Sequence, residues 1–413
     1  MISRKLSIRL NLMSGNRFEK MNADYNFDEL TDRRNTACVK WDSYADSDII
    51  PMWVADMDFR TAPAVTEALK RRVEEGIFGY VSVPDSYYDA LIGWFRHRHG
   101  WDIDRDMVIY TSGVVPALSA TIKALTRPGE GVIIQTPAYN CFFSSVRNNG
   151  CREIYNALKR IETPTGFTYE IDFENLEILA SEPTTTLLIL CNPQNPTGRV
   201  WRSEELEKVR EICARNGVRV VSDEIHCELI HNGYRYIPYG TIDSEAIILC
   251  SPSKAFNTAG LQIANIVCPD ENIRIRIDRA INDNEVCDVN PFGVAGLIAA
   301  YNEGEDWLNE LNHYLDSNYQ YLREFLSKNL PDLPCCDSEA TYLAWVDIKP
   351  LGIDYDEVDS LLMKEAKVIV NGGGMYHGDG YIRINYACPR SLLEEGLSRI
   401  VKCLSSIKER TEK

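Results

Sequence analysis

Short apolar runs alternate along most of the chain with segments whose apolar positions recur every three or four residues. The apolar runs predict strands at residues 108–111, 131–135, 186–191, 218–222 and 246–249. Helical spacing covers residues 63–76, 87–100 and 203–216. Strands that alternate with helices in this way are typical of β-α-β units. We therefore expect an α/β fold with a largely parallel sheet that helices cover on both faces.

The pattern changes at about residue 291, where long helical stretches surround a few short strands. These strands are predicted at residues 341–347, 367–370 and 381–385. We expect four parts: a disordered extension at 1–25, an N-terminal segment at 26–60 that packs with the small domain, a large domain at 61–290 and a small α+β domain at 291–413. The extension is basic but lacks the apolar core of a signal peptide.

Composition narrows the classes of function. The net charge of −17 argues against a nucleic-acid partner, because phosphate binding needs clustered cations. No apolar run approaches the ~20 residues that span a bilayer, so no membrane partner is expected. The 13 cysteines are odd in number and form no Cys-x-x-Cys pair, which favours free thiols in a reduced, cytoplasmic protein.

Asp223 comes directly after one apolar run that predicts a buried strand, and Lys254 ends the segment Ser-Pro-Ser-Lys at residues 251–254, which follows another. Alone, Lys254 is simply explained as a solvated loop residue, and Asp223 as the N-cap of a helix. A lysine that forms a Schiff base, however, needs a partly desolvated pocket, which the neighbouring apolar residues would supply. A buried carboxylate needs a cationic partner, and a protonated pyridine nitrogen would be one for Asp223.

Asn195 and Tyr139 also follow predicted strands. Asn195 belongs to the segment 192–198, Asn-Pro-Gln-Asn-Pro-Thr-Gly, whose Asn-Pro steps are ordinary turn signals. Directly after a buried strand, these steps would hold the Asn195 amide at the floor of a pocket. There it could bind a phenolic oxygen on the ring of a bound cofactor. Tyr139 is placed to stack on an aromatic ring, although a half-buried core tyrosine would have the same position.

An anion site is predicted where the strand at 108–111 runs into a helix. Gly113, Val114 and Val115 would offer free backbone N–H groups there, although any strand–helix junction offers some. Ser251 and Ser253 would add hydroxyl donors. Together, the lysine, carboxylate, amide, aromatic ring and anion site fit one cofactor, pyridoxal 5′-phosphate.

In their order, six motifs resemble the fold-type I pyridoxal-phosphate enzymes, the class I/II aminotransferase superfamily. They are Ser-Gly-Val, Tyr, Asn-Pro-x-Asn-Pro-x-Gly, Asp-Glu-x-His, Ser-x-Ser-Lys and the late arginine of Tyr-Ile-Arg-Ile-Asn. The match runs from about residue 22 to the C-terminus. It implies a large domain with a mostly parallel seven-stranded sheet between helices, plus a smaller α+β C-terminal domain.

The segment Pro-Met-Trp-Val-Ala-Asp-Met-Asp-Phe at residues 51–59 is similar to a signature of one branch, the cystathionine β-lyases of MalY/PatB type. Phe-Gly-Tyr at residues 78–80 is similar to a loop of the same branch. In that branch the tyrosine, here Tyr80, reaches the cofactor phosphate of the neighbouring subunit. The resemblance therefore implies a homodimer with shared active sites.

The resemblance also assigns roles residue by residue. Lys254 would be the Schiff-base lysine and the acid/base, and Asp223 would pair with the pyridine nitrogen. Asn195 would bind the phenolic oxygen and contribute to substrate binding, and Tyr139 would stack on the ring. Arg383 would hold the substrate α-carboxylate through its planar fork.

Two positions differ from the general aminotransferase pattern. His226 stands where a tyrosine is usual, within the cofactor site, and Gln262 stands where many relatives have a phosphate-binding arginine. Both substitutions are compatible with the lyase branch. They leave the phosphate with less cationic support, so the contact from Tyr80 would matter more.

These residues predict a β-elimination that converts L-cystathionine, or a related cysteine S-conjugate, into a thiol, pyruvate and ammonia. An aminotransferase on the same scaffold is the first alternative, and a regulatory protein that keeps the fold is the second. No metal site is expected. His97 and His99 lie on a basic segment that is typical of a solvated helix end.

Overall fold

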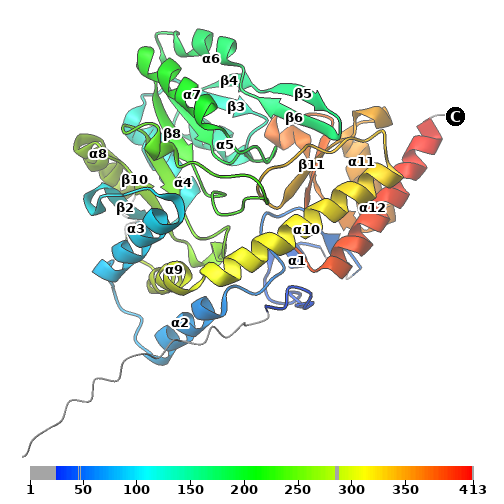
Figure 1. Ribbon diagram of the computed structural model, residues 1–413, viewed down its shortest axis with the longest axis horizontal. Helices are drawn as coiled ribbons and strands as arrows, with labels where there is room; N and C mark the ends of the chain where they lie inside the picture. Colours follow the sequence, from blue (N-terminus) through cyan, green and yellow to red (C-terminus); the bar gives the residue numbers. More distant parts are fainter. Residues whose placement is uncertain (1–24, 45, 47, 284–287, 412–413) are drawn as a thin grey trace, which may run out of the picture.

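A seven-stranded sheet forms the centre of the protein (Figure 1), for which a computed structural model describes residues 25–44, 46, 48–283 and 288–411. The extension predicted at residues 1–25 lies outside the described residues, except for Tyr25. The strand order is β2 (Val108–Thr111), β10 (Ala264–Val267), β9 (Ile247–Cys250), β8 (Arg219–Asp223), β7 (Thr185–Cys191), β3 (Gly131–Thr136) and β4 (Arg152–Ala157). Strand β10 runs antiparallel to both of its neighbours, β2 and β9, and the other neighbouring pairs of this sheet are parallel.

The sheet is apolar on both faces, as the uninterrupted apolar runs of its strands predict. In β7, Leu187 and Ile189 belong to the core on one face, whereas Leu188 and Leu190 belong to the core on the other. Successive residues of a strand point to opposite faces. A strand covered on both sides therefore needs apolar residues at every position.

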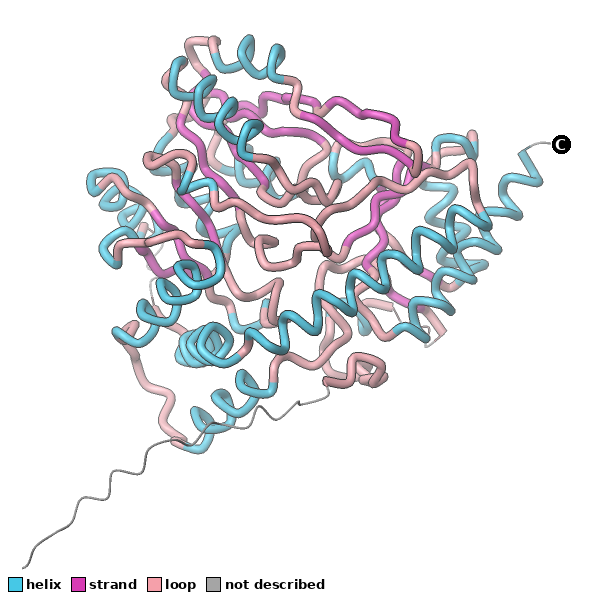
Figure 2. Tube along the Cα trace, in the orientation of Figure 1, coloured by secondary structure: helices cyan, strands magenta, loops and turns pink. Residues whose placement is uncertain are grey.

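Helices pack on both faces of the seven-stranded sheet, and the tube view in Figure 2 shows them around the strands. The helices α4 (Val114–Leu125), α5 (Asn140–Asn148) and α8 (Glu271–Asn282) cover one face, and α6 (Phe173–Ala180) and α7 (Ser203–Arg215) cover the other. A further group packs beside the sheet and consists of α2 (Pro63–Glu74), α3 (Asp85–His99) and α9 (Pro291–Glu303).

The C-terminal part has its own small sheet, with the order β11 (Leu343–Asp347), β14 (Tyr381–Asn385) and β13 (Asn371–Gly372), all antiparallel. The short strand β1 (Ile50–Pro51) pairs in parallel with β12 (Val368–Ile369) and so ties the N-terminal segment to this part. In Figure 1 the long helix α10 (Glu305–Asn329) lies along α12 (Arg390–Thr411). The remaining helices are α1 (Val39–Asp42) and α11 (Tyr355–Leu361).

Every strand and helix that the sequence predicted is present, with ends that differ by at most two residues. The sequence pattern did not predict the polar edge strand β4, the antiparallel β10, the short β13 or the hairpin of β5 (Lys159–Thr163) and β6 (Gly166–Glu170). Strand β4 is half exposed at the edge of the sheet, so its residues carry no continuous apolar run. The domain boundaries at residues 60 and 290 stay predictions. Among the described helices, none combines the length and apolar character needed to cross a membrane.

Candidate active site

A cavity of about 410 Å³ opens where the carboxyl ends of β7, β8 and β9 meet the N-terminus of α4. Ligands bind at this edge in open α/β sheets. The lining includes ten of the twelve residues that the sequence singled out: Gly113, Val114, Val115, Tyr139, Asn195, Asp223, His226, Ser253, Lys254 and Arg383. The charged members of the described lining are Asp223, Lys254 and Arg383.

Lys254 lies in the loop that follows β9, and its amine points toward the N-terminal segment. Its Nζ donates a hydrogen bond to the carbonyl oxygen of Ala55 at 2.6 Å. Burial, and then the positive charge of Arg383, lower the pKa of Lys254 to about 8. A larger fraction of the amine is therefore uncharged near neutral pH than in an exposed lysine, as a nucleophile or a base requires.

Asp223 is the last residue of β8 and is buried. Its Oδ1 accepts a hydrogen bond from the backbone N–H of Ile225 at 3.1 Å. Burial raises the pKa of Asp223 to about 7, against the opposing effects of that hydrogen bond and of the Lys254 charge. A buried carboxylate that is expensive to ionise favours a cationic ligand group in the cavity.

His226 follows in the same loop and has a buried Nδ1 without a hydrogen-bond partner among the described residues. Burial, together with the charges of Lys254 and Arg383, lowers the pKa of His226 to about 3, so the ring is neutral. An unpartnered buried nitrogen is costly unless a ligand meets it. His226 lines the cavity, so its neutral ring contributes to the polar surroundings of a ligand there.

The anion site predicted at the start of α4 has the expected geometry. The first intrahelical hydrogen bond runs from Ala117 N to Gly113 O, so the preceding N–H groups of Val114 and Val115 need other partners. Within the part of the chain that the structure describes, no side chain caps this end of the helix. Free N–H groups at the positive end of a helix, open to a cavity, suit a phosphate.

Arg383 lies in the middle of β14 and is buried. Its Nη1 donates to Asn195 Oδ1 and its Nη2 to the carbonyl oxygen of Trp53, both at 3.1 Å. The guanidinium also lies over the ring of Tyr376, 4.7 Å from its centre. These contacts fix the plane of the guanidinium, which prepares it to hold a carboxylate by two parallel hydrogen bonds.

Ser251 and Tyr80, the other two predicted site residues, do not line the cavity of this chain. The hydroxyl of Ser251 donates to the carbonyl oxygen of Ile263 at 2.6 Å and accepts from Ser253 N at 3.1 Å. Ser251 therefore shapes the loop instead of facing the cavity. The side chain of Tyr80 is 95% exposed, so any role in an active site requires another subunit.

The lining also includes residues to which the sequence assigned no role. Trp53 and Ala55 belong to the signature segment at residues 51–59, and Asn371 and Met375 belong to the C-terminal part. They contribute backbone carbonyls or neutral side chains, whose role in a site the residue type alone does not indicate. Tyr376, which also belongs to the C-terminal part, lines the cavity as well.

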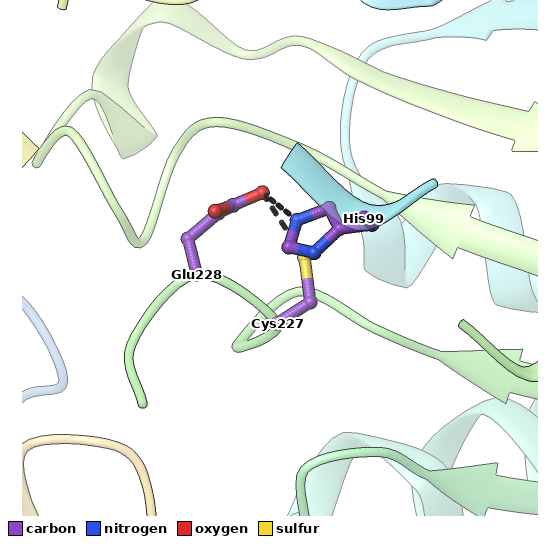
Figure 3. Close-up of side chains that lie close together, drawn as sticks. All are labelled: His99, Cys227 and Glu228. Carbon is purple, nitrogen blue, oxygen red and sulfur yellow. Dashed lines mark hydrogen bonds and ion pairs between the residues drawn. The ribbon is translucent and has the colours of Figure 1, made fainter. Parts of the chain in front are cut away.

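One expectation about the histidines was wrong. His97 is exposed, but the His99 ring is largely buried, and its Nε2 lies 2.7 Å from Glu228 Oε1 (Figure 3). The face of α3 that carries His99 is turned toward the buried Glu228. Glu228 also accepts hydrogen bonds from Trp94 at 2.6 Å and from Arg98 at 2.7 Å. Cys227 lies beside them, which gives three potential metal ligands. The carboxylate is already satisfied by these donors, so the group is explained as an ion-pair cluster.

Comparison with known proteins supports the family resemblance that the sequence motifs indicated. The profile of the family "Aminotransferase class I and II" matches residues 47–400. Cystathionine β-lyase PatB of Bacillus subtilis is 40% identical over 390 residues, which cover 92% of this chain and 100% of that protein.

Two solved structures share the fold. Cystalysin from Treponema denticola, which contains pyridoxal 5′-phosphate, has a TM-score of 0.88 at 32% identity and covers 92% of this chain and 99% of its own. The pyridoxal-phosphate-bound C–S lyase of Staphylococcus hominis has a TM-score of 0.85 at 36% identity, with the same coverage. The chain therefore belongs to the class I and II aminotransferase family, and its resemblance to the C–S lyase branch is confirmed.

Proposed function

We propose that this protein is a pyridoxal-phosphate-dependent carbon–sulfur β-lyase. Its substrates are amino acids with sulfur on Cβ, such as L-cystathionine, and its products are a thiol (homocysteine from cystathionine), pyruvate and ammonia. The observation that carries the proposal is the meeting of Lys254, Asp223 and Arg383 in one cavity beside the free N-terminus of α4. Lys254 supplies a nucleophilic amine, and Asp223 accepts a hydrogen bond from a cationic group. Arg383 binds a carboxylate, and the start of α4 binds a phosphate.

The residues fit the cofactor at each of its polar groups. The N-terminus of α4 and Ser253 would hold the phosphate, and Asp223 would hold the protonated pyridine nitrogen. Asn195 would bind the phenolic oxygen, and Tyr139 would stack on the ring. When bound, the cofactor supplies an electron sink for the pair left at the substrate Cα.

Three residues of the chain have separate roles in the reaction. Arg383 binds the α-carboxylate and so fixes the orientation of the substrate. The free Lys254 amine would act as the base that removes the proton from Cα. Asp223 would keep the ring nitrogen of the bound cofactor protonated. Loss of the thiolate from Cβ leaves an unsaturated amine, which water converts to pyruvate and ammonia.

The proposal extends to assembly and location. We propose a homodimer in the cytoplasm, in which Tyr80 of each chain reaches the phosphate of the other. Supporting this, Ile77, Phe78 and Tyr80 are 75%, 58% and 95% exposed, and this degree of apolar exposure along one segment is typical of an interface. Sedimentation of the purified protein should give twice the mass of the chain. A monomer that retained full activity would refute the shared site.

The function is tested by incubating the purified protein with L-cystathionine and measuring pyruvate and free thiol in one sample. Equal amounts of both, together with the visible absorbance of a lysine-bound cofactor, are expected. Exchange of amino groups with an added keto acid, without pyruvate, would instead identify an aminotransferase. Bound cofactor without any turnover would favour the regulatory alternative.

A further inference from the structure

Residues 52–59, here called the strap, pass between the loop that carries Lys254 and the strand that carries Arg383. The backbone of the strap is held mainly by side chains, not by a neighbouring strand. From the loop, Lys254 Nζ donates to Ala55 O at 2.6 Å. Asn257 contacts the strap three times: its Nδ2 donates to Met57 O and Phe59 O at 2.9 Å each, and its Oδ1 accepts from Met57 N at 3.0 Å.

Strand β14 holds the same strap from the other side. Arg383 Nη2 donates to Trp53 O at 3.1 Å. Asn385, two residues further along, donates through Nδ2 to the carbonyl oxygens of Val54 and Asp56 at 2.6 Å each, and through its backbone N to Met52 O at 2.9 Å. Lys254 and Arg383 thus bind successive parts of one segment, and each is accompanied by an asparagine that binds the same segment.

The strap is also fixed on its outer side by buried charge. Asp58 is 3% exposed and accepts from Lys40, Arg33 and Trp41, each at 2.8 Å. Breaking one partner from a buried charge network is strongly unfavourable. The strap therefore behaves as a rigid reference between the two parts of the chain, and not as a loose connection.

Asparagine is well suited to both positions. A side-chain amide offers two donors and an acceptor in one plane, which is what the contacts of Asn257 use. Asn257 also has a φ of 53°, a left-handed conformation that asparagine tolerates better than most residues. An aspartate of nearly the same size would keep an acceptor but lose the donors.

We propose that Asn257 and Asn385 are positioning residues that, by holding the strap from opposite sides, set the position of the Lys254 amine relative to the Arg383 guanidinium. This inference rests on the proposed function, in which the two groups act on one substrate. Misplacement of about 1 Å can cost about a hundredfold in rate, so two catalytic groups from different parts of a chain need a common support.

The test compares Asn257→Asp, Asn385→Asp and the double variant with the wild-type holoenzyme. Asn149→Asp is the matched control, because Asn149 also donates to two backbone carbonyls, those of Ser119 and Ser145, but outside the strap. Two quantities are measured: the pH midpoint of the visible absorbance of the lysine-bound cofactor, which needs no substrate, and kcat and KM for thiol release.

For Asn257→Asp we expect a shifted midpoint and a fall in kcat of about tenfold, with KM changed less. For Asn385→Asp we expect KM to rise about tenfold, because the carboxylate clamp is displaced. The double variant should lose less than the product of the single losses, because both act through one strap. The control should match the wild type. Thermal unfolding checks that the aspartate variants are folded. If they are not, Asn257→Gly and Asn385→Ala replace them.

Two results would overturn the inference. One is a wild-type midpoint and wild-type kinetics in both single variants. The other is a double variant whose fold-change equals the product of the two single fold-changes, which would mean that Asn257 and Asn385 act independently. A failure of the proposed function is distinguishable, because the wild type itself would then release no thiol, while the midpoint comparison would still test the strap.

Discussion

Replacing Arg383 by lysine tests the carboxylate clamp in a way that keeps the positive charge. The guanidinium is buried and held in plane by Asn195, Trp53 and Tyr376, so its fork can donate two parallel bonds. A lysine ammonium cannot reproduce that geometry. A hydrogen bond to a charged group contributes about 1.5–3 kcal/mol, so losing one of the two should lower kcat/KM by about 10- to 150-fold.

The assay is thiol release from an S-alkyl-L-cysteine by the wild type and by Arg383→Lys. The matched control ligand is the corresponding amine without the carboxylate, whose inhibition constant should differ by less than about twofold between the two proteins. A fall in kcat/KM of less than about threefold would refute the clamp. An equal loss of affinity for the amine would show that the variant disturbs the whole cavity instead.

Three further predictions follow from the site. Asp223→Asn removes a buried carboxylate whose pKa burial raises to about 7, so at pH 8 the apoprotein should melt at a higher temperature. Its cofactor affinity should nevertheless fall by about a hundredfold or more, since losing one partner of a buried ion pair costs about 3–5 kcal/mol; unchanged affinity would exclude the pairing. Tyr80→Phe should raise the cofactor dissociation constant about tenfold, and no change would remove Tyr80 from the site. Because the pKa of Lys254 is lowered to about 8, cofactor uptake by the apoprotein should accelerate with rising pH and level off above about pH 8; a rate independent of pH would contradict this.

The buried strands were predictable because burial on both faces demands apolar residues at every position. Strand β7 satisfies this demand, and Asn195, in the loop after its carboxyl end, lines the cavity. In the hairpin, β5 is polar and has no fully buried residue, and β6 buries only Phe167 and Tyr169, which is too short an alternation to stand out in the sequence. Strand β10 was missed because Asn265, a buried polar residue, interrupts its apolar run.

The candidate site was predictable where a side chain carries the chemistry. Lys254, Asp223 and Arg383 have residue types that few other roles explain in this order. The strap lies within the signature at residues 51–59, but its contact with Lys254 was not predictable, because Ala55 contributes only a backbone carbonyl. The burial of His99 depended on which side of α3 meets Glu228, a tertiary contact that the charge pattern of the helix does not encode.

The central claim is that Lys254 carries the cofactor, and one measurement tests it most directly. The purified holoenzyme is reduced with borohydride, which makes the bond between lysine and cofactor permanent, and its peptides are analysed by mass spectrometry. We predict one pyridoxyl-phosphate adduct per chain, on Lys254, and no adduct in Lys254→Ala, which should also lack thiol release. An adduct on a different lysine, or full turnover by Lys254→Ala, would contradict the account.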